Sequence, residues 1–508
     1  MSCIVLQLGQ CGNQVGQRVF DTLIEDNLTH LNPSKLSIEN RLSINDYVRH
    51  SLDRFFIQHE NKLTARALAI DTELKVIDQL MNEKSQSKRH WSYEKKCVIE
   101  ENRLSINDYV RHSLDRFFIQ HENNLTARAL AIDTELKVID QLMNEKSQSK
   151  RHWSYEKKCV IEGRLGSGNN WACGYRNGSL AEENILNSLR WQLENSDRVD
   201  AILPILSLAG GTGSGLGAYV VECIRDELPR SFLLTTIVVP YTSGEVVVQN
   251  YNSLLTLSHL YHSADALLVF ENDILQQYAK KLVSCSGLDR PTNIHDMNNI
   301  LTRHLCSFLQ PISNKNASIC EINYLLESLL PNSFYKLLTL RCVPQLSDQA
   351  LDFSTYKWSS LIKNLSQMYI NNSYLDEGLN WSLKPHQTRT KSVANLFLAR
   401  SYDKDDIDQD LKQYFNHSTL YSSYTPSSDY YSVFNYRDKS YLNYEKYISL
   451  ISNCQTPVSA LDRIVSKSWQ LFGQKAYLHH YLKYDVDEQA FLNGFVQIEQ
   501  VIKSYKDL

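Results

Sequence analysis

The feature that most constrains this chain is a glycine-rich tract at residues 207–215. It reads Ser-Leu-Ala-Gly-Gly-Thr-Gly-Ser-Gly, follows the apolar run 201–206 and precedes the helix-like stretch 216–225. Glycines let the backbone come close to a bound group, and the N–H groups at the start of a helix attract anions. Between a strand and a helix, such a turn predicts a phosphate-binding site in preference to a merely flexible loop.

Two better-known phosphate-binding motifs do not account for this tract. The lysine-bearing P-loop needs Gly-Lys followed by Ser or Thr, and the sequence contains no such triplet. Residues 213–218 (GSGLGA) fit the dinucleotide pattern G-x-G-x-x-A, which also requires an acid at the end of the next strand. That strand, predicted at 232–239, ends in Pro240-Tyr-Thr, so nicotinamide chemistry is disfavoured.

Apolar, strand-like segments alternate with helix-like segments in the first part of the chain, and polar or glycine-rich turns follow them. This order predicts an α/β fold with an open, Rossmann-like parallel sheet whose ligand lies at the carboxyl ends of the strands. The strands are predicted at 3–8, 126–133 (or its twin 64–71), 157–161, 201–206, 232–239 and 265–270.

The length of 508 residues allows two or three domains. An apolar stripe predicts a long central helix at about 292–310, which would complete a nucleotide-binding domain spanning 1–313. Residues 314–456 are expected to form a second α/β domain. Two amphipathic stretches in 457–508 predict a C-terminal helical hairpin.

Residues 39–100 recur at 101–162 with a single difference, Lys62 against Asn124. Near-identity in only two copies disfavours a structural repeat array and points to a recent duplication or to an error in assembling the gene. One parallel sheet has a single slot for the strand that both copies encode. We expect the second copy to fill it, because its end leads directly into the turn at Gly163, and the first copy to be extruded as an insertion.

Composition excludes several classes of protein. The net charge is −4 and charged residues make up 22% of the chain, which disfavours a nucleic-acid-binding polycation. Eleven cysteines without a C-x-x-C pair favour reduced thiols in the cytoplasm over disulfides or a zinc site. No apolar run approaches the roughly 18 residues of a membrane span, so neither nucleic acid nor membrane is an expected partner.

Several motifs in this order resemble tubulins, over nearly the whole chain once one copy of the duplication is removed. They are GQCGNQ at 9–14, GSGNNW at 166–171, AGGTGSG at 209–215, QNYNS at 249–253, SVAN at 392–395 and KAYLH at 475–479. Within that family, Ala209 in place of a glycine, the 166–171 motif and the run 244–261 are more similar to the delta branch than to alpha or beta chains.

The resemblance implies that the chain binds GTP with Mg²⁺. It places Gln10 and Cys11 at the phosphates or base, Asn169 at the terminal phosphate, and Asn272 and Asn298 at the guanine edge, where an amide supplies both a donor and an acceptor. The residues that would surround the phosphates are Ser207, Ala209, Gly210, Gly211, Thr212, Gly213, Ser214 and Gly215.

A metal role is implied for Glu135, or for its duplicate Glu73. This residue lies two positions past Asp133 (or Asp71) and matches the acid that approaches magnesium, usually through water.

Three positions depart from the family pattern. Ile294 stands where an aromatic ring would stack on the guanine, and Gln249 stands where a glutamate would face the ribose, with Glu245 nearby. Tyr324 stands where an acid would position the attacking water in the site of a neighbouring subunit. Glu321 and Glu327 lie three positions either side of Tyr324, so no catalytic residue is assigned.

The resemblance implies a GTP-binding structural subunit of microtubule-based centriole or basal-body structures, with other tubulin-family subunits as partners in the cytoplasmic cytoskeleton. Two alternatives remain open at this point. One is an active GTPase subunit of a dynamic polymer, and the other is a guanine-nucleotide-binding protein that does not polymerise.

Overall fold

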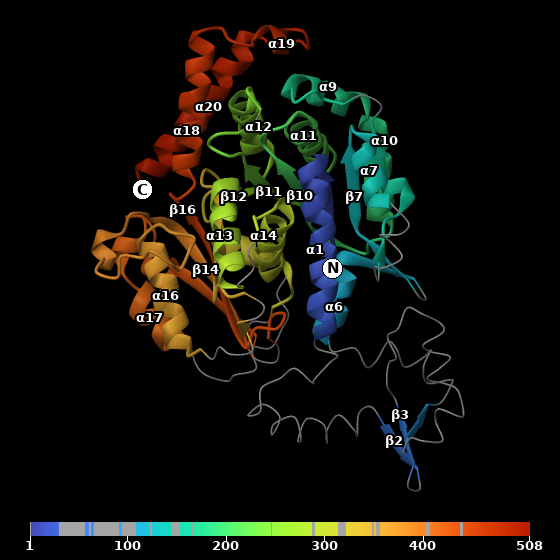
Figure 1. Ribbon diagram of the computed structural model, residues 1–508, viewed down its shortest axis with the longest axis vertical. Coiled ribbons are helices and arrows are strands. Elements are labelled where there is room, and N and C mark those ends of the chain that lie inside the picture. The colour runs from blue at the N-terminus through green and yellow to red at the C-terminus, as the bar shows by residue number, and fades with distance from the viewer. Residues whose placement is uncertain are drawn as a thin grey trace.

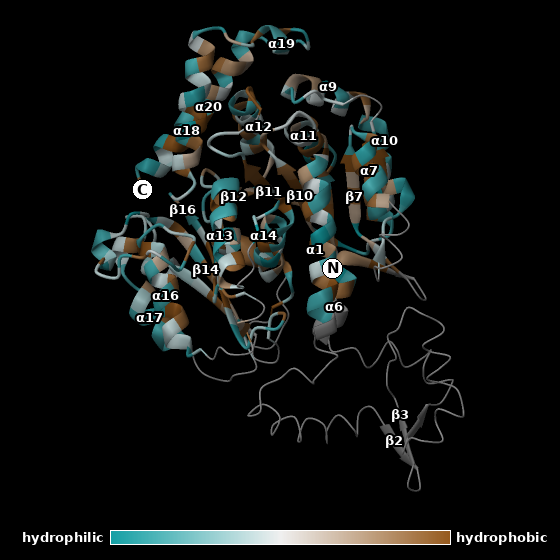
Figure 2. Cartoon of the chain, viewed as in Figure 1, coloured by the Kyte–Doolittle hydropathy of each residue, from teal (hydrophilic) through white to brown (hydrophobic). Residues whose placement is uncertain are grey.

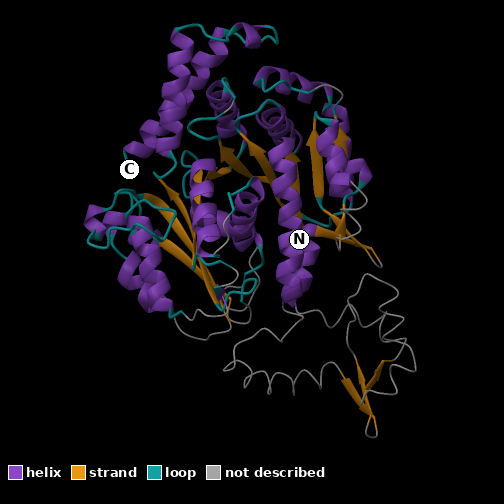
Figure 3. Cartoon of the chain, in the orientation of Figure 1, coloured by secondary structure: helices purple, strands orange, loops and turns teal. Residues whose placement is uncertain are grey.

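The computed structural model describes residues 2–29, 56–59, 62–65, 91–93, 108–121, 124–143, 153–163, 166–244, 246–286, 290–312, 322–347, 350–351, 356–401, 407–436 and 440–508. A ten-stranded sheet runs through the molecule, and helices cover both of its faces (Figures 1 and 3). Among the described helices, none has the length and apolar character needed to cross a membrane.

The strands of this sheet lie in the order β15-β14-β16-β13-β12-β11-β10-β1-β7-β9. All neighbours from β13 to β9 are parallel, whereas β16 is antiparallel to both β13 and β14. The bounds are β1 Ser2–Leu8, β7 Ala129–Asp133, β9 Val160–Glu162, β10 Val199–Ser207, β11 Phe232–Val239, β12 Ala266–Glu271, β13 Leu337–Val343, β14 Ser392–Ser401, β15 Tyr431–Tyr436 and β16 Lys446–Cys454.

One sheet therefore continues across the boundary predicted between residues 313 and 314. The pairs Leu267↔Leu337 and Leu268↔Leu338 join β12 to β13, the first strand of the second segment. That segment also has a separate core around Trp358, Phe397 and Ile448. The domain boundaries remain predictions, but the two segments share a backbone ladder.

The helices divide between the two faces of the sheet. The face covered by α1, α6, α7, α13, α14 and α15 is opposite the face covered by α9, α10, α11, α12, α18 and α20. The bounds are α1 Gly9–Thr29, α6 Asp108–Phe117, α7 Leu136–Met143, α9 Trp171–Leu180, α10 Glu182–Glu194, α11 Gly217–Glu227, α12 Gln249–Ser263, α13 Asn272–Cys285, α14 Ile294–Leu309, α15 Ile322–Leu329, α16 Trp358–Ile370, α17 Asp408–Phe415, α18 Val458–Gly473, α19 His479–Leu482 and α20 Glu488–Lys506.

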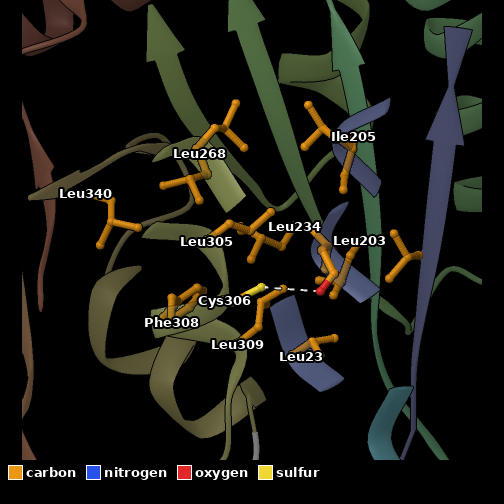
Figure 4. Packing of buried hydrophobic residues seen from close by; sticks show 14 of the residues in the cluster. Leu23, Leu203, Ile205, Leu234, Leu268, Leu305, Cys306, Phe308, Leu309 and Leu340 are labelled. Carbon is orange, nitrogen blue, oxygen red and sulfur yellow. Dashed lines mark hydrogen bonds between the residues drawn. The ribbon is translucent and has the colours of Figure 1, made fainter. Parts of the chain in front are cut away.

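Alternation along the strands creates two cores, one on each face. In β10, Leu203 and Ile205 face the α1/α14 side, whereas Ile202 and Leu206 face the α11/α12 side. Figure 4 shows Leu203, Ile205, Leu234 and Leu268 of the strands in one cluster with Leu23 of α1 and with Leu305, Phe308 and Leu309 of α14. Figure 2 shows the strands as the most apolar part of the chain. Because both faces are buried, these strands read as continuous apolar runs.

The second copy of the duplication supplies the strand next to β1. Residues of β7 pair in parallel with β1 on one side and with β9 on the other. The equivalent stretch of the first copy, 67–71, lies outside the described residues.

Each copy nevertheless forms a three-stranded sheet of its own, and the two sheets have the same pairing order. The first copy forms the sheet β2 (Phe56–His59), β3 (Lys62–Ala65) and β4 (Trp91–Tyr93). The second copy forms the sheet β5 (Phe118–His121), β6 (Asn124–Ala127) and β8 (Trp153–Ser154). The register is also the same, since Phe56 pairs with Ala65 as Phe118 pairs with Ala127.

Candidate nucleotide site

The turn between β1 and α1 lies directly against the glycine-rich tract. Gly9 has φ +73°, a conformation that favours glycine, and a side chain there would come within 2.7 Å of the Gly213 nitrogen. This contact puts the first turn of α1 beside the tract. Gln10 is exposed in that turn and Cys11 is partly buried. Burial raises the pKa of the Cys11 thiol to about 12, so at neutral pH it is a protonated packing group and not a nucleophile.

The glycine-rich tract begins at the end of β10 and winds directly into α11. The Ser207 hydroxyl accepts a hydrogen bond from the Ala209 N–H at 3.3 Å, and residues 212–216 form a π-helical turn that continues into α11. Sequence patterns predicted that the helix would begin at 216, but winding begins at Thr212. The early start leaves the N–H groups of the first turn beside Gly210 and Gly211, where an anion can accept from them.

A second turn, 166–170, packs against this tract. Gly211 is so close to it that an added Cβ would lie 2.7 Å from the Ser167 side chain and 2.8 Å from the Asn170 backbone. Asn169 is exposed in a left-handed conformation with φ +54°. Asn170 caps α9, because its side chain accepts from the Cys173 N–H at 3.1 Å. The two turns predicted to contact phosphate therefore form one surface.

Three hydroxyls from three segments meet at this surface. The Thr134 and Thr212 hydroxyls lie 2.6 Å apart, and each lies 3.3 Å from the Ser167 hydroxyl. Thr134 and Ser167 were not predicted as site residues. Their positions directly after β7 and inside the 166–171 motif were the available signals.

Two carboxyl groups border the hydroxyls. Asp133, at the end of β7, is buried and accepts from the Glu135 N–H at 3.0 Å and the Asn13 amide at 3.5 Å. Burial raises its pKa to about 6, and the backbone hydrogen bond opposes this only in part. Glu135 is exposed.

The oxygen atoms of these hydroxyl and carboxyl groups fit Mg²⁺ when a bound nucleotide supplies the remaining ligands. The described residues contain no group of three or more His, Cys, Asp or Glu side chains that could hold a metal by themselves. Mg²⁺ commonly keeps several waters and binds through one or two carboxylates together with substrate phosphates. One exposed carboxylate beside hydroxyls, with a buried carboxyl group behind it, meets that requirement when a nucleotide supplies phosphate oxygens.

The predicted guanine contacts lie on two helices on the α1 side of the sheet. Asn272 is the first residue of α13, directly after β12, and Asn298 is a buried residue of α14. The Asn298 amide lies 3.5 Å from the Gln14 side-chain oxygen, which ties this part of α14 to α1. Ile294, at the start of α14, is 47% exposed and could offer a base only aliphatic contact.

Gln249, the position expected at the ribose, is hydrogen-bonded within the chain. Its side chain is buried and its amide donates to the Tyr241 carbonyl at 2.9 Å. Glu245, the nearby acid, lies outside the described residues. The Gln249 amide is therefore already hydrogen-bonded within the chain, and the side chain has no carboxylate that could contact a ribose.

Two of the positions considered for a water-positioning acid, Tyr324 and Glu327, lie on α15. Tyr324 is 57% exposed and makes an edge contact with Phe434, with ring centroids 5.9 Å apart. Glu327 is exposed, and Glu321 lies outside the described residues. The geometry therefore leaves Glu327 available to a neighbouring molecule.

Glycine-rich and amide-bearing turns at the carboxyl ends of parallel strands are typical of a nucleotide-binding protein. Comparison of the sequence with known families shows to which family of such proteins it belongs. The family model described as Tubulin/FtsZ family, GTPase domain, matches residues 2–111 and 93–280. The chain is 34% identical to the tubulin delta chain of Canis lupus familiaris over 530 aligned residues that cover 100% of both chains.

It is 33% identical to the tubulin delta chain of Homo sapiens, again across 100% of both, and 26% identical to the tubulin gamma chain of Saccharomyces cerevisiae over 76% of this chain and 80% of that one. The chain belongs to the tubulin family. The predictions of an α/β GTP-binding fold and of a likeness to the delta branch are confirmed.

Proposed function

We propose that this chain is a GTP-binding structural subunit of centriole or basal-body microtubules and works in the cytoplasmic cytoskeleton beside other tubulin-family subunits. The observation that carries the nucleotide part is the contact between the turns at Gly9, 166–170 and 207–215. The likeness to tubulin delta chains over their whole length supports the subunit part.

In this proposal the nucleotide lies across the carboxyl ends of β1, β7 and β10, with its phosphates above the glycine-rich tract. Backbone N–H groups of 210–213 and the Thr212 hydroxyl contact the phosphates, together with Gln10 and Asn169. Asn272 and Asn298 contact the guanine edge. Glu135 would hold Mg²⁺ through water beside the nucleotide phosphates, and the charge of that ion would favour the ionised form of Asp133.

The nucleotide proposal is tested with a fluorescent GTP analogue, using ATP as competitor. Thr212→Val keeps the side-chain shape and removes the hydroxyl, and should weaken GTP binding about tenfold, since hydrogen bonds to charged groups are strong. Thr425→Val is the control, because its hydroxyl donates to the Val393 carbonyl at 3.1 Å in the second segment. Equal GTP affinity in both variants would refute the assigned role of Thr212.

Association is tested in cells that build centrioles or basal bodies. A tagged chain should co-purify with another tubulin-family subunit and localise to those structures. A monomeric chain that binds GTP but joins no such assembly would favour the non-polymerising alternative.

Hydrolysis depends on an acid that one subunit presents to another. Turnover that rises with protein concentration and disappears in the double variant Glu321→Ala/Glu327→Ala would establish the GTPase alternative. Glu183→Ala, which removes another exposed acid at the start of α10, is the control. Turnover that does not respond to concentration supports the proposed structural role.

A further inference from the structure

One buried amide connects the two phosphate-facing turns. Asn252 lies in α12 and is fully buried. Its Nδ2 atom donates to the carbonyl of Asn169 at 2.8 Å and to the carbonyl of Ala209 at 2.8 Å. One side chain thereby sets the distance between the 166–170 turn and the glycine-rich tract.

The oxygen of the same amide is also fully used. The Asn252 Oδ1 atom accepts from the Trp171 N–H at 3.0 Å and from the Tyr481 hydroxyl at 2.7 Å. An asparagine amide offers two donor hydrogens and two acceptor lone pairs, so all four positions have partners. Aspartate has the same size but no amide hydrogens, and would place a carboxylate against two carbonyl oxygens.

The fourth partner, Tyr481, belongs to the C-terminal hairpin. It is a fully buried residue of α19, the short helix between α18 and α20 that lies beside α9 in Figure 1. A second link runs from the Asn170 amide to the His480 carbonyl at 3.1 Å. The tip of the hairpin is therefore bonded to residues that hold the nucleotide-facing turns.

We propose that Asn252 is a positioning residue that couples nucleotide binding to the seating of α19. A nucleotide that orders the two turns also fixes the carbonyls and the N–H that orient the Asn252 amide, and the oriented amide accepts from Tyr481. Because such coupling is reciprocal, a partner that holds α19 in place tightens nucleotide binding. This inference rests on the proposed GTP binding.

The experiment is hydrogen exchange of the full chain with and without GTP and Mg²⁺, with affinity measured on the same samples. We expect GTP to slow exchange about fivefold or more in residues 477–486 as well as in 9–14. Unchanged exchange at 477–486 in protein that binds GTP overturns the coupling. Failure to bind GTP at all is a different result, because it overturns the proposed function on which the coupling rests.

Two variants and one control separate coupling from general stability. Tyr481→Phe removes the hydroxyl and keeps the ring, and should reduce the GTP effect at 477–486 to less than about twofold while the effect at 9–14 remains. Asn252→Asp should lose both effects and weaken GTP binding more than tenfold; if it does not fold, Tyr481→Phe decides alone.

Tyr251→Phe is the matched control. Tyr251 packs against Tyr481 and Phe491 in the same aromatic cluster, and its buried hydroxyl has no hydrogen-bond partner among the described residues. It should behave as wild type. A GTP effect in Tyr481→Phe as large as in Tyr251→Phe overturns the role of the Tyr481 hydroxyl, and therefore of the coupling.

Discussion

His304 illustrates how a single buried residue can make this fold sensitive to acid. It lies in α14 with 6% of its surface exposed, and its ring centroid is 5.3 Å from that of Tyr278. Burial, assisted by the positive charge of Arg303, lowers its pKa to about 3. An unfolded histidine has a pKa of about 6.5. Below pH 6.5 the unfolded chain therefore binds a proton that the folded chain does not, and stability falls as the pH falls.

The prediction is a pH-dependent difference between wild type and His304→Gln. From pH 7 to pH 5, the wild-type free energy of unfolding should fall by about 2 kcal/mol more than that of the variant, since each pH unit below 6.5 contributes about 1.4 kcal/mol. Urea denaturation at several pH values measures this. A difference that is constant with pH would show that folded His304 becomes protonated as readily as an unfolded histidine.

Neighbouring glycines of the phosphate-facing tract should differ sharply in their tolerance of a methyl group. Gly211 has φ −88°, which any residue can adopt, but an added Cβ would lie 2.7 Å from Ser167 and 2.8 Å from the Asn170 backbone. An added Cβ at Gly210 would meet only the Asn169 side chain at 3.7 Å, an ordinary contact.

Gly211→Ala should therefore lower the free energy of unfolding by about 1–3 kcal/mol, the usual cost of overpacking, and Gly210→Ala by much less. Urea denaturation without nucleotide compares the two variants, so that direct effects on GTP are excluded. Equal stability of the two variants would mean that the turns move apart at no cost.

The glycine-rich tract could be predicted from sequence because its pattern is local. The roles of Thr134, Ser167 and Asn252 could not be, because a hydroxyl or an amide gains its partners only when distant strand ends meet. Gln249 makes the opposite point. Its place in the chain suggested a ribose contact, but the fold directs its amide to the Tyr241 carbonyl.

Among the elements, α14 contains a predicted guanine contact and begins with a capping box. Asn293 caps it by accepting from the Asp296 N–H at 2.9 Å, and Asp296 in turn accepts from the Asn293 N–H at 2.9 Å. Arg290 adds two hydrogen bonds of 2.8 Å to Asp296, and this pairing lowers the pKa of the Asp296 carboxyl. The capping box fixes where the helix that holds Asn298 begins.

Asn293→Ala should cost about 1 kcal/mol of stability, and Asn293→Ser, which keeps a capping oxygen, should cost only a few tenths. Urea denaturation with both variants provides the comparison. If serine and alanine destabilise equally, the cap does not act through its side-chain oxygen.

The elements were predictable where the apolar pattern was long. β11 matches the predicted 232–239, and α14 lies within the predicted central helix. The short strand predicted at 157–161 was wrong at its start, because residues 157–159 form a 3₁₀ turn in which the Glu156 side chain accepts from the Lys158 N–H. Such a side-chain cap outweighs the strand preference of a few residues.

At the scale of the whole molecule, the duplication poses a test of which residues the fold needs. The ten-stranded sheet takes β7 from the second copy. Its other nine strands lie outside residues 39–100. The sequence indicated that two copies compete for one position in the sheet. Because the copies are nearly identical, their internal contacts do not favour either one. Which copy enters the sheet depends on the segments that flank it, and their arrangement is known only from the folded structure.

Deleting residues 39–100 should leave the fold and GTP affinity unchanged within about twofold. Deleting 101–162 instead produces the same sequence except for Lys in place of Asn at one position, and should give the same result. Thermal unfolding and nucleotide binding measure both. Loss of folding in both deletions would show that the body depends on the extra segment, and sequencing the transcript across 39–162 would show whether cells make it.

A sheet with room for one β7 also changes how mutations act on the two copies. A polar replacement at Leu130 enters a buried strand, and selection will remove it. The matching codon is that of Leu68, in the copy that does not supply β7. We therefore expect the two stretches to drift at unequal rates across descendants of this gene, with 39–100 changing faster.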